Sequence, residues 1–323
     1  MILDVCTGSS HGAVDLIGIG ECMVEFHAST SLGDASILEK SFGGDVLNTL
    51  VHAARNGLRT AFVTQVGNDP FGDYLIRCWQ SEGVDTSWAR MVEGVNGVYF
   101  ISVDSEGERQ FTYRRAGSAA ARMSPDALDT DFLKCSGTVF VSGISQAISA
   151  SAAAVVERAV ASVGDDVRLV YDPNFRPALW DEGSGLHGAR DAYRVGARGA
   201  SWVLPSYPAD VPLVSDCAPG PREALRLFTA DCPRVAMKMG GDGVLMSVHG
   251  VESEAPAARV ERVIDTTGAG DAWNGAFMAA LQGGAGALEA AALANAYAGG
   301  TLAFRGAIPP RSAAPMESAG GQP

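Results

Sequence analysis

The most constraining feature of this 323-residue sequence is a regular alternation of short buried strands with longer helical segments. Six short apolar runs rich in β-branched residues are typical of strands in a parallel sheet: Val14–Gly20, Arg59–Val66, Thr138–Gly143, Val167–Tyr171, Ala200–Leu204 and Arg234–Met239. Segments with helical spacing lie between and after them: Val46–Asn56, Phe71–Ser81, Ala150–Ser162, Leu186–Ala197, Pro221–Phe228, Ala269–Gln282 and Ala287–Phe304. Such alternation implies βαβ units, so we expect an α/β fold, a three-layer α/β/α sandwich around a mainly parallel sheet.

One region interrupts this alternation. Gly97–Val103 and Arg109–Arg115 are short strand-like runs around the turn sequence Ser105-Glu106-Gly107, which predicts an antiparallel hairpin. Together with an extended stretch over about 22–42, the hairpin at about 97–115 predicts a small β lid that carries substrate contacts. We expect one domain over 14–310, with flexible tails at 1–13 and 311–323.

Charge and hydropathy exclude several classes of partner. The chain has 24 lysines and arginines against 37 aspartates and glutamates, a formal net charge of −13, which argues against binding to a nucleic-acid backbone. No apolar run approaches the roughly 18–20 residues of a membrane span, and residues 1–13 lack the regions of a signal peptide. The sequence contains no C-x-x-C or H-x-x-x-H spacing, so it does not predict a zinc site. We expect no nucleic-acid or membrane partner and a cytoplasmic location.

The segment Asp265-Thr266-Thr267-Gly268-Ala269-Gly270-Asp271 precedes an alanine-rich helix. Its glycines let the backbone approach a ligand closely, and the first amides of the helix point outward, as in sites for a phosphate or a developing anion. A carboxylate beside such a site is unfavourable unless it has a task, and Asp271 could accept the proton of an attacking alcohol. A tight turn with a capping aspartate is the structural alternative.

Other phosphate-binding motifs are weaker in this sequence. It contains no G-x-x-x-x-G-K-[ST] motif, which argues against a P-loop. Gly18-Ile19-Gly20 lacks the third glycine of a dinucleotide fingerprint, because Met23 stands in its place.

Two motifs together carry a family resemblance. Asp265–Asp271 resembles the C-terminal signature of the ribokinase-like (PfkB) carbohydrate kinases. Gly43-Gly44-Asp45-Val46-Leu47-Asn48 and, further along the chain, Gly67-Asn68-Asp69-Pro70-Phe71-Gly72 resemble their N-terminal signature. The resemblance covers about 14–310, and it implies a ribokinase-like fold and ATP-dependent phosphorylation of a sugar with Mg²⁺.

The lid segment bears on the substrate. Phe111-Thr112-Tyr113-Arg114-Arg115-Ala116-Gly117 resembles the lid of 2-keto-3-deoxygluconate kinases, and Asp172-Pro173-Asn174-Phe175-Arg176 resembles both these and fructokinases. A keto acid carries a carboxylate that a guanidinium can hold with two charge-assisted hydrogen bonds, whereas a neutral sugar needs only hydroxyl partners. Arg115 and Arg176 are therefore the candidates for binding that carboxylate, and two solvated surface arginines are the alternative.

The resemblance also implies roles for other residues. Gly43, Gly44 and Asn48 would line the floor of the sugar site, and Tyr99 and Tyr113 would close it from the lid. On the catalytic side, the amides of Gly268, Ala269 and Gly270 would form an anion hole for the transferred group, with Asp271 as the base.

For the nucleotide, Lys238-Met239-Gly240-Gly241-Asp242-Gly243 resembles the family's K-x-G-x-x-G turn beside ATP. Asn295 matches an asparagine near the adenine, and Asn174 and Arg176 are implied near the phosphates, so Arg176 could serve either ligand. Relatives often carry N-x-x-E after the strand that ends here at Leu204, but this chain has Ser206 and Ala209, which leaves Asp210 as the candidate for ordering the metal's waters.

Asp265 and the Thr267 carbonyl resemble a loop that binds K⁺ in several relatives, so K⁺ is a possible further cofactor. The sequence thus predicts a kinase that phosphorylates the 6-hydroxyl of 2-keto-3-deoxygluconate. Two alternatives stay open: a fructokinase or other sugar kinase of this family, and a non-catalytic sugar- or nucleotide-binding protein on the same fold. The open edge of a β lid also makes a homodimer through the lid plausible.

Overall fold

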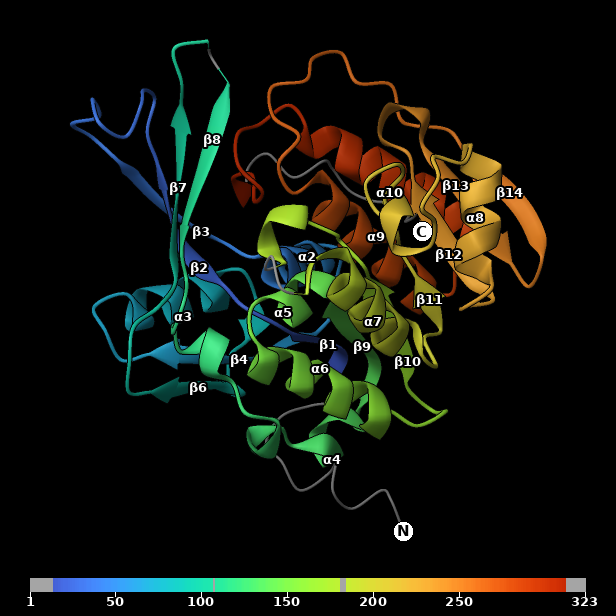
Figure 1. Cartoon of the computed structure of the whole chain (residues 1–323), viewed down its shortest axis with the longest axis horizontal. Helices are drawn as coiled ribbons and strands as arrows, with labels where there is room; N and C mark the ends of the chain where they lie inside the picture. The colour runs from blue at the N-terminus through green and yellow to red at the C-terminus, as the bar shows by residue number, and fades with distance from the viewer. Residues whose placement is uncertain (1–13, 107, 181–183, 312–323) are drawn as a thin grey trace, which may run out of the picture.

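The computed structural model describes residues 14–106, 108–180 and 184–311. The predicted flexible tails, 1–13 and 311–323, lie outside the described residues apart from Arg311. The described residues fold into a large mixed sheet with helices on both faces and a second, smaller sheet that projects from one side (Figure 1).

Ten strands form the main sheet in the order β14-β13-β12-β11-β10-β9-β1-β4-β5, with β6 also paired to β4. Their bounds are β1 Val14–Ile19, β4 Thr60–Gly67, β5 Val84–Asp85, β6 Ala89–Val92, β9 Ser136–Ser142, β10 Arg168–Asp172, β11 Trp202–Val203, β12 Arg234–Lys238, β13 Val244–Val248 and β14 Val251–Ala255. All pairs are parallel except β12 with β13 and β13 with β14. The six predicted strands and the mainly parallel sheet are confirmed, and the sequence analysis missed β5, β6 and the antiparallel edge β13–β14.

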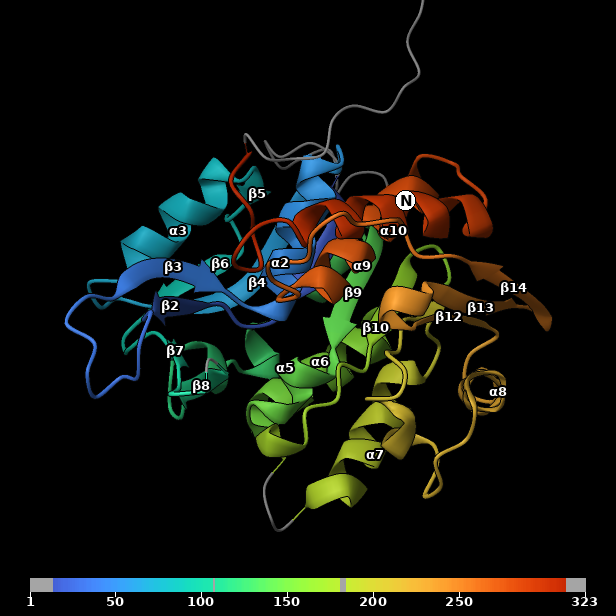
Figure 2. The same ribbon diagram turned by 90° about the horizontal axis from the view of Figure 1, so that it is seen from above.

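Alternate residues of the central strands point to opposite faces and so build two cores. Ile17 and Val139 belong to one apolar cluster, whereas their neighbours Leu16 and Phe140 belong to the other. Helices α2 Asp45–Arg55, α3 Gly72–Ser81, α9 Ala269–Gln282 and α10 Ala287–Thr301 pack on the Leu16 side. Helices α6 Ala150–Ser162, α7 Gly185–Ala197 and α8 Pro221–Thr229 pack on the other side, so the three predicted layers are confirmed (Figure 2).

Two shorter helices, α4 Thr130–Leu133 and α5 Gly143–Ala147, complete the α-helices of the described residues. The predicted helices match the observed ones to within one residue at each end, apart from α10. That helix was expected to run to Phe304 but ends at Thr301. The Leu302 carbonyl accepts hydrogen bonds from the amides of Ile264 and Asp265, so this segment supports the loop before α9 instead of extending the helix.

The smaller sheet has the order β3-β2-β7-β8, with β2 at Met23–His27, β3 at Glu39–Gly43, β7 at Val98–Val103 and β8 at Arg109–Arg114. Val98 pairs with Arg114 and Val103 with Arg109, which confirms the predicted antiparallel hairpin. We call these four strands the lid sheet. No helix of the described residues is long and apolar enough to cross a bilayer.

Candidate active site

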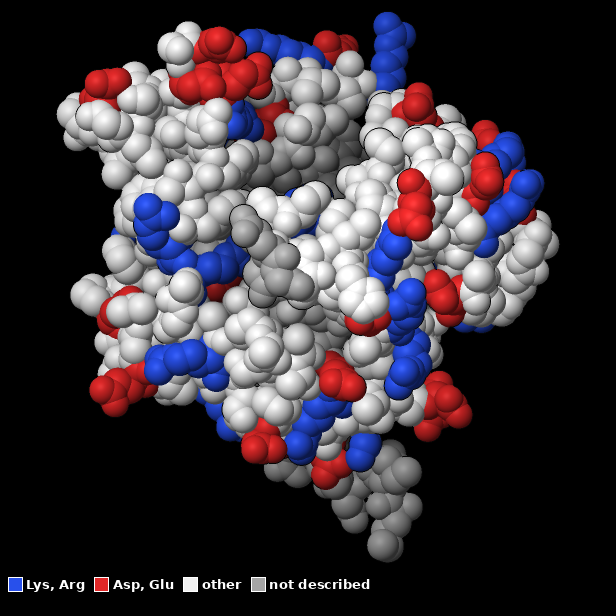
Figure 3. All heavy atoms as spheres, in the orientation of Figure 1, with Lys and Arg blue, Asp and Glu red and all other residues white. Residues whose placement is uncertain are grey.

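A cavity of about 500 Å³ lies between the carboxyl ends of the central strands and the lid sheet. In the space-filling view the molecule is hollowed between the β7–β8 hairpin and the half that carries α9 and α10 (Figure 3). Most of the predicted site residues line this cavity: Gly43, Gly44, Asn48, Tyr99, Tyr113, Arg115, Asn174, Arg176, Ser206, Lys238, Gly268, Ala269, Gly270 and Asp271. Segments far apart in sequence are thus brought to one place.

The N-terminus of α9 opens directly into the cavity. Gly268 precedes the helix with a left-handed φ of 72°, and a Cβ on it would lie 2.5 Å from the Cβ of Ala307, so only glycine fits. The Ala269 amide donates to the Thr266 carbonyl at 3.2 Å, whereas no acceptor among the described residues takes a hydrogen bond from the amide of Gly268 or Gly270. Two of the three predicted donors are therefore available to an anion.

Asp271 lies in the first turn of α9, partly buried at the cavity wall. Asn48 on α2 donates to its carboxylate at 2.8 Å. Burial and the neighbouring charge of Asp45 raise the pKa of Asp271 to about 8, although the Asn48 hydrogen bond opposes that shift. A carboxyl group with such a pKa binds a proton readily near neutral pH, as a general base must.

Lys238 pairs with a second buried carboxylate, that of Asp172, near Asp271. Its ammonium group donates to Asp172 at 2.8 Å and to the Asn274 side-chain oxygen at 3.0 Å, and Asn274 also donates to Asp172 at 2.6 Å. All three side chains are at least nine-tenths buried. Asp172 and Asn274 were not predicted as site residues; a carboxylate directly after a buried strand was the available signal for Asp172.

Arg115 faces the cavity next to Glu21, which the sequence analysis also missed. The Arg115 Nη1 and Glu21 Oε2 atoms are 3.1 Å apart. Within the described part of the chain, Nε and Nη1 of Arg115 and Oε2 of Glu21 make no hydrogen bond despite their burial. Burial raises the pKa of Glu21, and the Arg115 charge counteracts this. The site thus holds a buried guanidinium whose ion-pair partner in the described chain is a carboxyl group of raised pKa.

The two predicted tyrosines stack on each other with ring centroids 5.6 Å apart. Tyr99 is buried, and its hydroxyl donates to Glu25 on β2. Tyr99 can therefore meet a ligand through its ring or as a hydrogen-bond acceptor, whereas Tyr113 is more exposed and lies under the Arg115 guanidinium. Gly44 precedes α2 and lies against the Glu21 backbone. A Cβ at this position would be 2.1 Å from the Glu21 carbonyl oxygen, so only glycine fits.

Three further predicted residues lie on the wall opposite the lid sheet. Arg176 is exposed and bonds only to the adjacent Phe175 carbonyl among the described residues, and Asn174 donates to Asp45 at 3.2 Å. The Ser206 amide donates to Asp210 at 2.6 Å, and the Phe175 amide donates to the other oxygen of that carboxylate. Asp210 is fully buried and does not line the cavity, so its geometry favours a structural role over ordering metal-bound water.

A second cavity of about 390 Å³ adjoins the first and is lined mainly by glycine and apolar side chains. Gly240, Gly243 and Asn295 lie here, and Lys238, Thr266, Ala269 and Gly270 line both cavities. The Asn295 amide group donates to the Ala255 and Pro256 carbonyls and accepts from the Trp273 indole at 2.8 Å. Asn295 therefore fixes the wall of this cavity, with both of its amide hydrogens already used.

Asp265 lies outside both cavities, behind the turn at Gly268. It accepts hydrogen bonds from the amides of Thr267 at 2.9 Å and Gly306 at 2.8 Å, and it pairs with Arg109 of β8. Burial raises its pKa, but Arg109 and these amides prevail and lower the pKa to about 2. Donors, including a guanidinium, thus surround the carboxylate predicted to bind K⁺.

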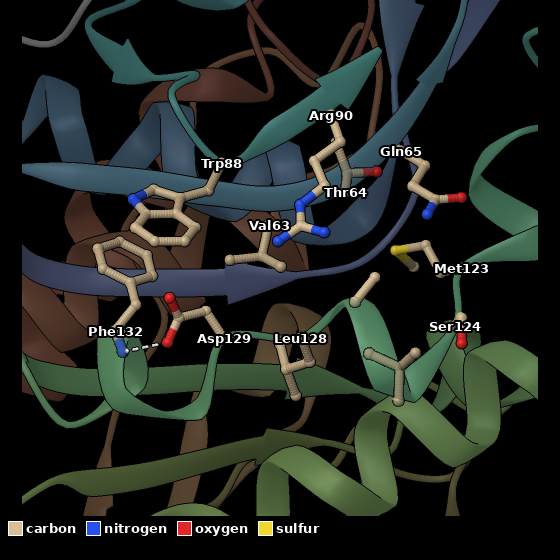
Figure 4. Close-up of a pocket in the computed structure, with 12 residues that line it drawn as sticks. Val63, Thr64, Gln65, Trp88, Arg90, Met123, Ser124, Leu128, Asp129 and Phe132 are labelled. Carbon is tan, nitrogen blue, oxygen red and sulfur yellow. Dashed lines mark hydrogen bonds between the residues drawn. The ribbon is translucent and has the colours of Figure 1, made fainter. Parts of the chain in front are cut away.

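A small void beside β4 differs from these cavities. It holds about 20 Å³ and is lined by residues such as Val63, Trp88, Met123 and Phe132, with Trp88 stacked on Phe132 at 3.9 Å (Figure 4). A space of this size accommodates about one water molecule, so it is no ligand site.

Comparison with known proteins agrees with this geometry. The model of the pfkB family carbohydrate kinases matches residues 14–314. The chain belongs to the PfkB family of carbohydrate kinases. It is 32% identical over 311 residues to the 2-dehydro-3-deoxygluconokinase of Dickeya dadantii, covering 92% of this chain and 97% of that protein. It is 30% identical over 319 residues to the enzyme of the same name from Escherichia coli K12, covering 92% and 97%.

Solved structures of PfkB kinases share the fold. A putative ribokinase II from E. coli, in complex with ATP and Mg²⁺, superposes with a TM-score of 0.82 at 26% identity, covering 91% of this chain and 94% of that one. The predicted ribokinase-like fold and kinase family are thereby confirmed, and the protein is a PfkB sugar kinase that takes a sugar and ATP as small-molecule partners.

Proposed function

We propose that this PfkB kinase transfers the γ-phosphoryl group of ATP to the 6-hydroxyl of 2-keto-3-deoxygluconate, giving ADP and 2-keto-3-deoxy-6-phosphogluconate. The observation that carries the substrate assignment is Arg115, which lines the cavity and whose guanidinium has Glu21 as its ion-pair partner among the described residues. The carboxylate of a sugar acid would give the guanidinium charge a second partner, whereas a neutral sugar would leave it paired with Glu21 alone. The names of the D. dadantii and E. coli relatives support the same substrate.

Asp271 is the proposed base. With the sugar-acid carboxylate at Arg115 and Arg176, the other end of the sugar would point toward Asp271, and Gly43, Gly44, Asn48, Tyr99 and Tyr113 would surround the chain between them. Asp271 would take the hydroxyl proton as the oxygen attacks phosphorus, while the amides of Gly268, Ala269 and Gly270 stabilise the charge on the transferred group. The Ala269 amide would have to leave the Thr266 carbonyl to contribute.

ATP would occupy the second cavity, with its adenine between the glycines of Gly240–Gly243 and the wall fixed by Asn295. Lys238, Ala269 and Gly270 line both cavities, so the γ-phosphate would lie at this junction, with Asn174 and Ser206 nearby. This placement puts the phosphoryl group beside both Asp271 and the α9 N-terminus.

Mg²⁺ fits the residues present. Burial and the charge of Asp172 raise the pKa of Asp45, and burial and the charges of Asp45 and Asp172 raise that of Asp271. The cavity thus holds excess negative charge and oxygen ligands that suit a hard cation. In the described chain, no group of three or more His, Cys, Asp or Glu side chains forms a complete metal site, which suits an ion held mainly through ATP phosphates and water. Asp45 and Asp172 would face the ion, which, when bound, offsets the charge of the phosphates.

K⁺ at Asp265 stays a prediction. A K⁺ ion at this carboxylate would have to displace Arg109, which pairs with it and also donates to the Thr267 hydroxyl at 3.1 Å. A homodimer through the free edge of the lid sheet is likewise a prediction, which sedimentation of the purified protein would test.

An ADP-coupled assay with 2-keto-3-deoxygluconate and with fructose tests the substrate. We expect turnover with the sugar acid and much slower turnover with fructose. Arg115→Gln should raise the KM for the sugar acid by roughly 10- to 100-fold, the effect of losing a charge-assisted hydrogen-bond pair, with little change for any neutral sugar. Faster turnover with fructose would favour the fructokinase alternative, and ATP binding without ADP release on any sugar would favour a binding protein.

The same assay tests the base. Asp271→Asn keeps the shape of the side chain and its hydrogen bond from Asn48, so the fold and ATP binding should persist. We expect kcat to fall by at least about 10²–10³-fold, the loss caused by removing a single transition-state contact in other enzymes. Near-normal turnover in this variant would show that another group takes the proton.

A further inference from the structure

The lid sheet reaches the loop before α9 through a single arginine. Arg109, the first residue of β8, pairs with Asp265 and donates to the Thr267 hydroxyl at 3.1 Å, across 156 residues of sequence. Asp265 is almost fully buried, and Arg109 is about two-thirds buried. The contact therefore lies inside the protein, where a charge pair with several hydrogen bonds is geometrically well defined.

The partners of Arg109 hold the turn that forms the proposed anion hole. Asp265 accepts from the Thr267 amide on one side and from the Gly306 amide on the other. Ala307, the residue after Gly306, packs so closely against Gly268 that no side chain fits there. A displacement of Arg109 would thus be transmitted through Asp265 to both segments that fix the backbone at Gly268.

A separate cavity of about 210 Å³ lies on the far side of this contact. It is lined by strands of the lid sheet, by Arg109 and Asp265, and by Arg305–Ile308, and it shares Ala307 with the substrate cavity. The lid sheet and the α9 loop are therefore separated by open space around Arg109. Among the described residues, the hydrogen bonds between β8 and this loop come from Arg109, so its position follows that of the lid.

We propose that Arg109 is a positioning residue that supplies an internal positive charge at the Asp265 loop, so that the seating of the lid sheet sets the geometry of the anion hole without a monovalent metal ion. The inference deepens the proposed function and rests on it. The cation predicted at Asp265 does not fit while the guanidinium is there. Asp265 already accepts hydrogen bonds from Arg109 and from the amides of Thr267 and Gly306, and the Thr267 hydroxyl accepts one from Arg109. Arg109 does not line either of the cavities proposed for the sugar acid and ATP.

The test replaces Arg109 and varies the salt at constant ionic strength. Arg109→Gln should lower kcat by roughly 10- to 100-fold with a small change in the KM for ATP, since a misplaced catalytic backbone costs about that much. K⁺ or guanidinium ions should restore part of the loss in Arg109→Gln, and Arg109→Lys should retain more activity than Arg109→Gln. Arg114→Gln is the matched control, because Arg114 lies on the same strand and bonds only to the neighbouring Tyr113 carbonyl within the described chain.

A readout without turnover separates this inference from the proposed function. The melting temperature of the wild-type protein should be the same in KCl and in tetramethylammonium chloride, whereas that of Arg109→Gln should rise selectively in KCl. Selective stabilisation of the wild type by K⁺ would overturn the proposal, as would a kcat of Arg109→Gln within about twofold of the wild type. A loss of kcat that neither cation restores would show that Arg109 contributes packing instead of charge. If the wild type phosphorylates no sugar, the proposed function fails, and the melting temperatures still decide which cation lies at Asp265.

Discussion

The carboxylates at the active-site cavity and those at the outer edge of the main sheet have opposite electrostatic surroundings. At the cavity, burial and neighbouring carboxylates raise the pKa of Asp271 to about 8 and also raise that of Asp45. At the edge, hydrogen bonds from the exposed Arg222 lower the pKa of the half-buried Glu252 on β14. The cavity carboxylates therefore cost folding free energy while unliganded, and the edge carboxylates contribute a little.

This difference follows from what each group can bind. Glu252 and Glu254 find their cations within the protein, on Arg222 and Arg226 of α8. The ammonium group of Lys238 lies near Asp172 and Asp271, and its hydrogen bonds go to Asp172 and Asn274. The remaining negative charge is available to a metal ion or a proton, which suits a site for Mg²⁺-dependent phosphoryl transfer.

The largest effect on stability is expected from removing that ammonium group. Lys238→Met would leave Asp172 buried beside two other acidic groups without its cation, which should lower the free energy of unfolding by about 3–5 kcal/mol. Urea unfolding at neutral pH measures this. Lys134→Met, which breaks the exposed Lys134–Asp131 pair, is the control and should change little.

The double variant Lys238→Met/Asp172→Asn sharpens that test. It removes the charge together with its partner, so most of the lost stability should return. If Lys238→Met lost less than about 1 kcal/mol, the cavity carboxylates would already be neutral or hydrated, and the contrast with the sheet edge would fail.

A smaller effect of opposite sign is expected at Asp271. Because its folded-state pKa is raised, the folded protein binds more protons than the unfolded chain between about pH 4 and pH 8, and stability falls as the pH rises through that window. Asp271→Asn removes this cost. It should stabilise the unliganded protein by on the order of 2 kcal/mol near pH 8, and by almost nothing at about pH 3, below the ordinary aspartate pKa of 3.8. Equal stability of the two proteins at both pH values would mean that the Asp271 pKa is ordinary.

The next effect concerns the pH dependence of turnover. If Asp271 must be ionised to accept the proton, kcat/KM for the sugar acid should rise with pH up to about 8. Asp45→Asn removes the nearest negative charge that raises this pKa, so the rising limb should move to lower pH by roughly half a unit to one unit. The position of the limb is the readout, because Asp45 also contacts Ser142 and Asn174 and its loss lowers the rate itself. A limb that stays in place would exclude Asp45 as a source of the shift.

The sequence predicted the parts of the site that are contiguous in the chain. The glycines before α9, Asp271 and the Gly43–Asn48 segment follow from local patterns of backbone freedom and helix termini. Glu21, Asp172 and Asn274 were missed because their roles arise from partners distant in sequence: Asn274 and Asp172 are 102 residues apart, and Lys238 and Asp172 are 66 apart. Only the folded sheet brings them together.

The same limit applies to the fold. The parallel strands carry continuous apolar runs, so their periodicity identified them. The β13–β14 hairpin turns at His249-Gly250, where both residues have positive φ, of 50° and 83°. Asparagine or aspartate before glycine is the usual signal for such a turn, and histidine in that position hid it.

The smallest effect is expected at the sheet edge. Glu252→Gln removes an acceptor that Arg222 and Arg226 share, but both arginine side chains are more than half exposed, so solvent and salt screen the pair. The melting temperature at neutral pH should fall by no more than about 1 °C, and the difference from the wild type should vanish in high salt. It should also shrink as the pH falls through the pKa of Glu252, because a lowered carboxylate pKa contributes stability only while the group is ionised. Calorimetry of the two proteins at two salt concentrations checks this. A loss comparable to that in Lys238→Met would mean that the edge network, and not burial at the cavity, dominates the electrostatics of this fold.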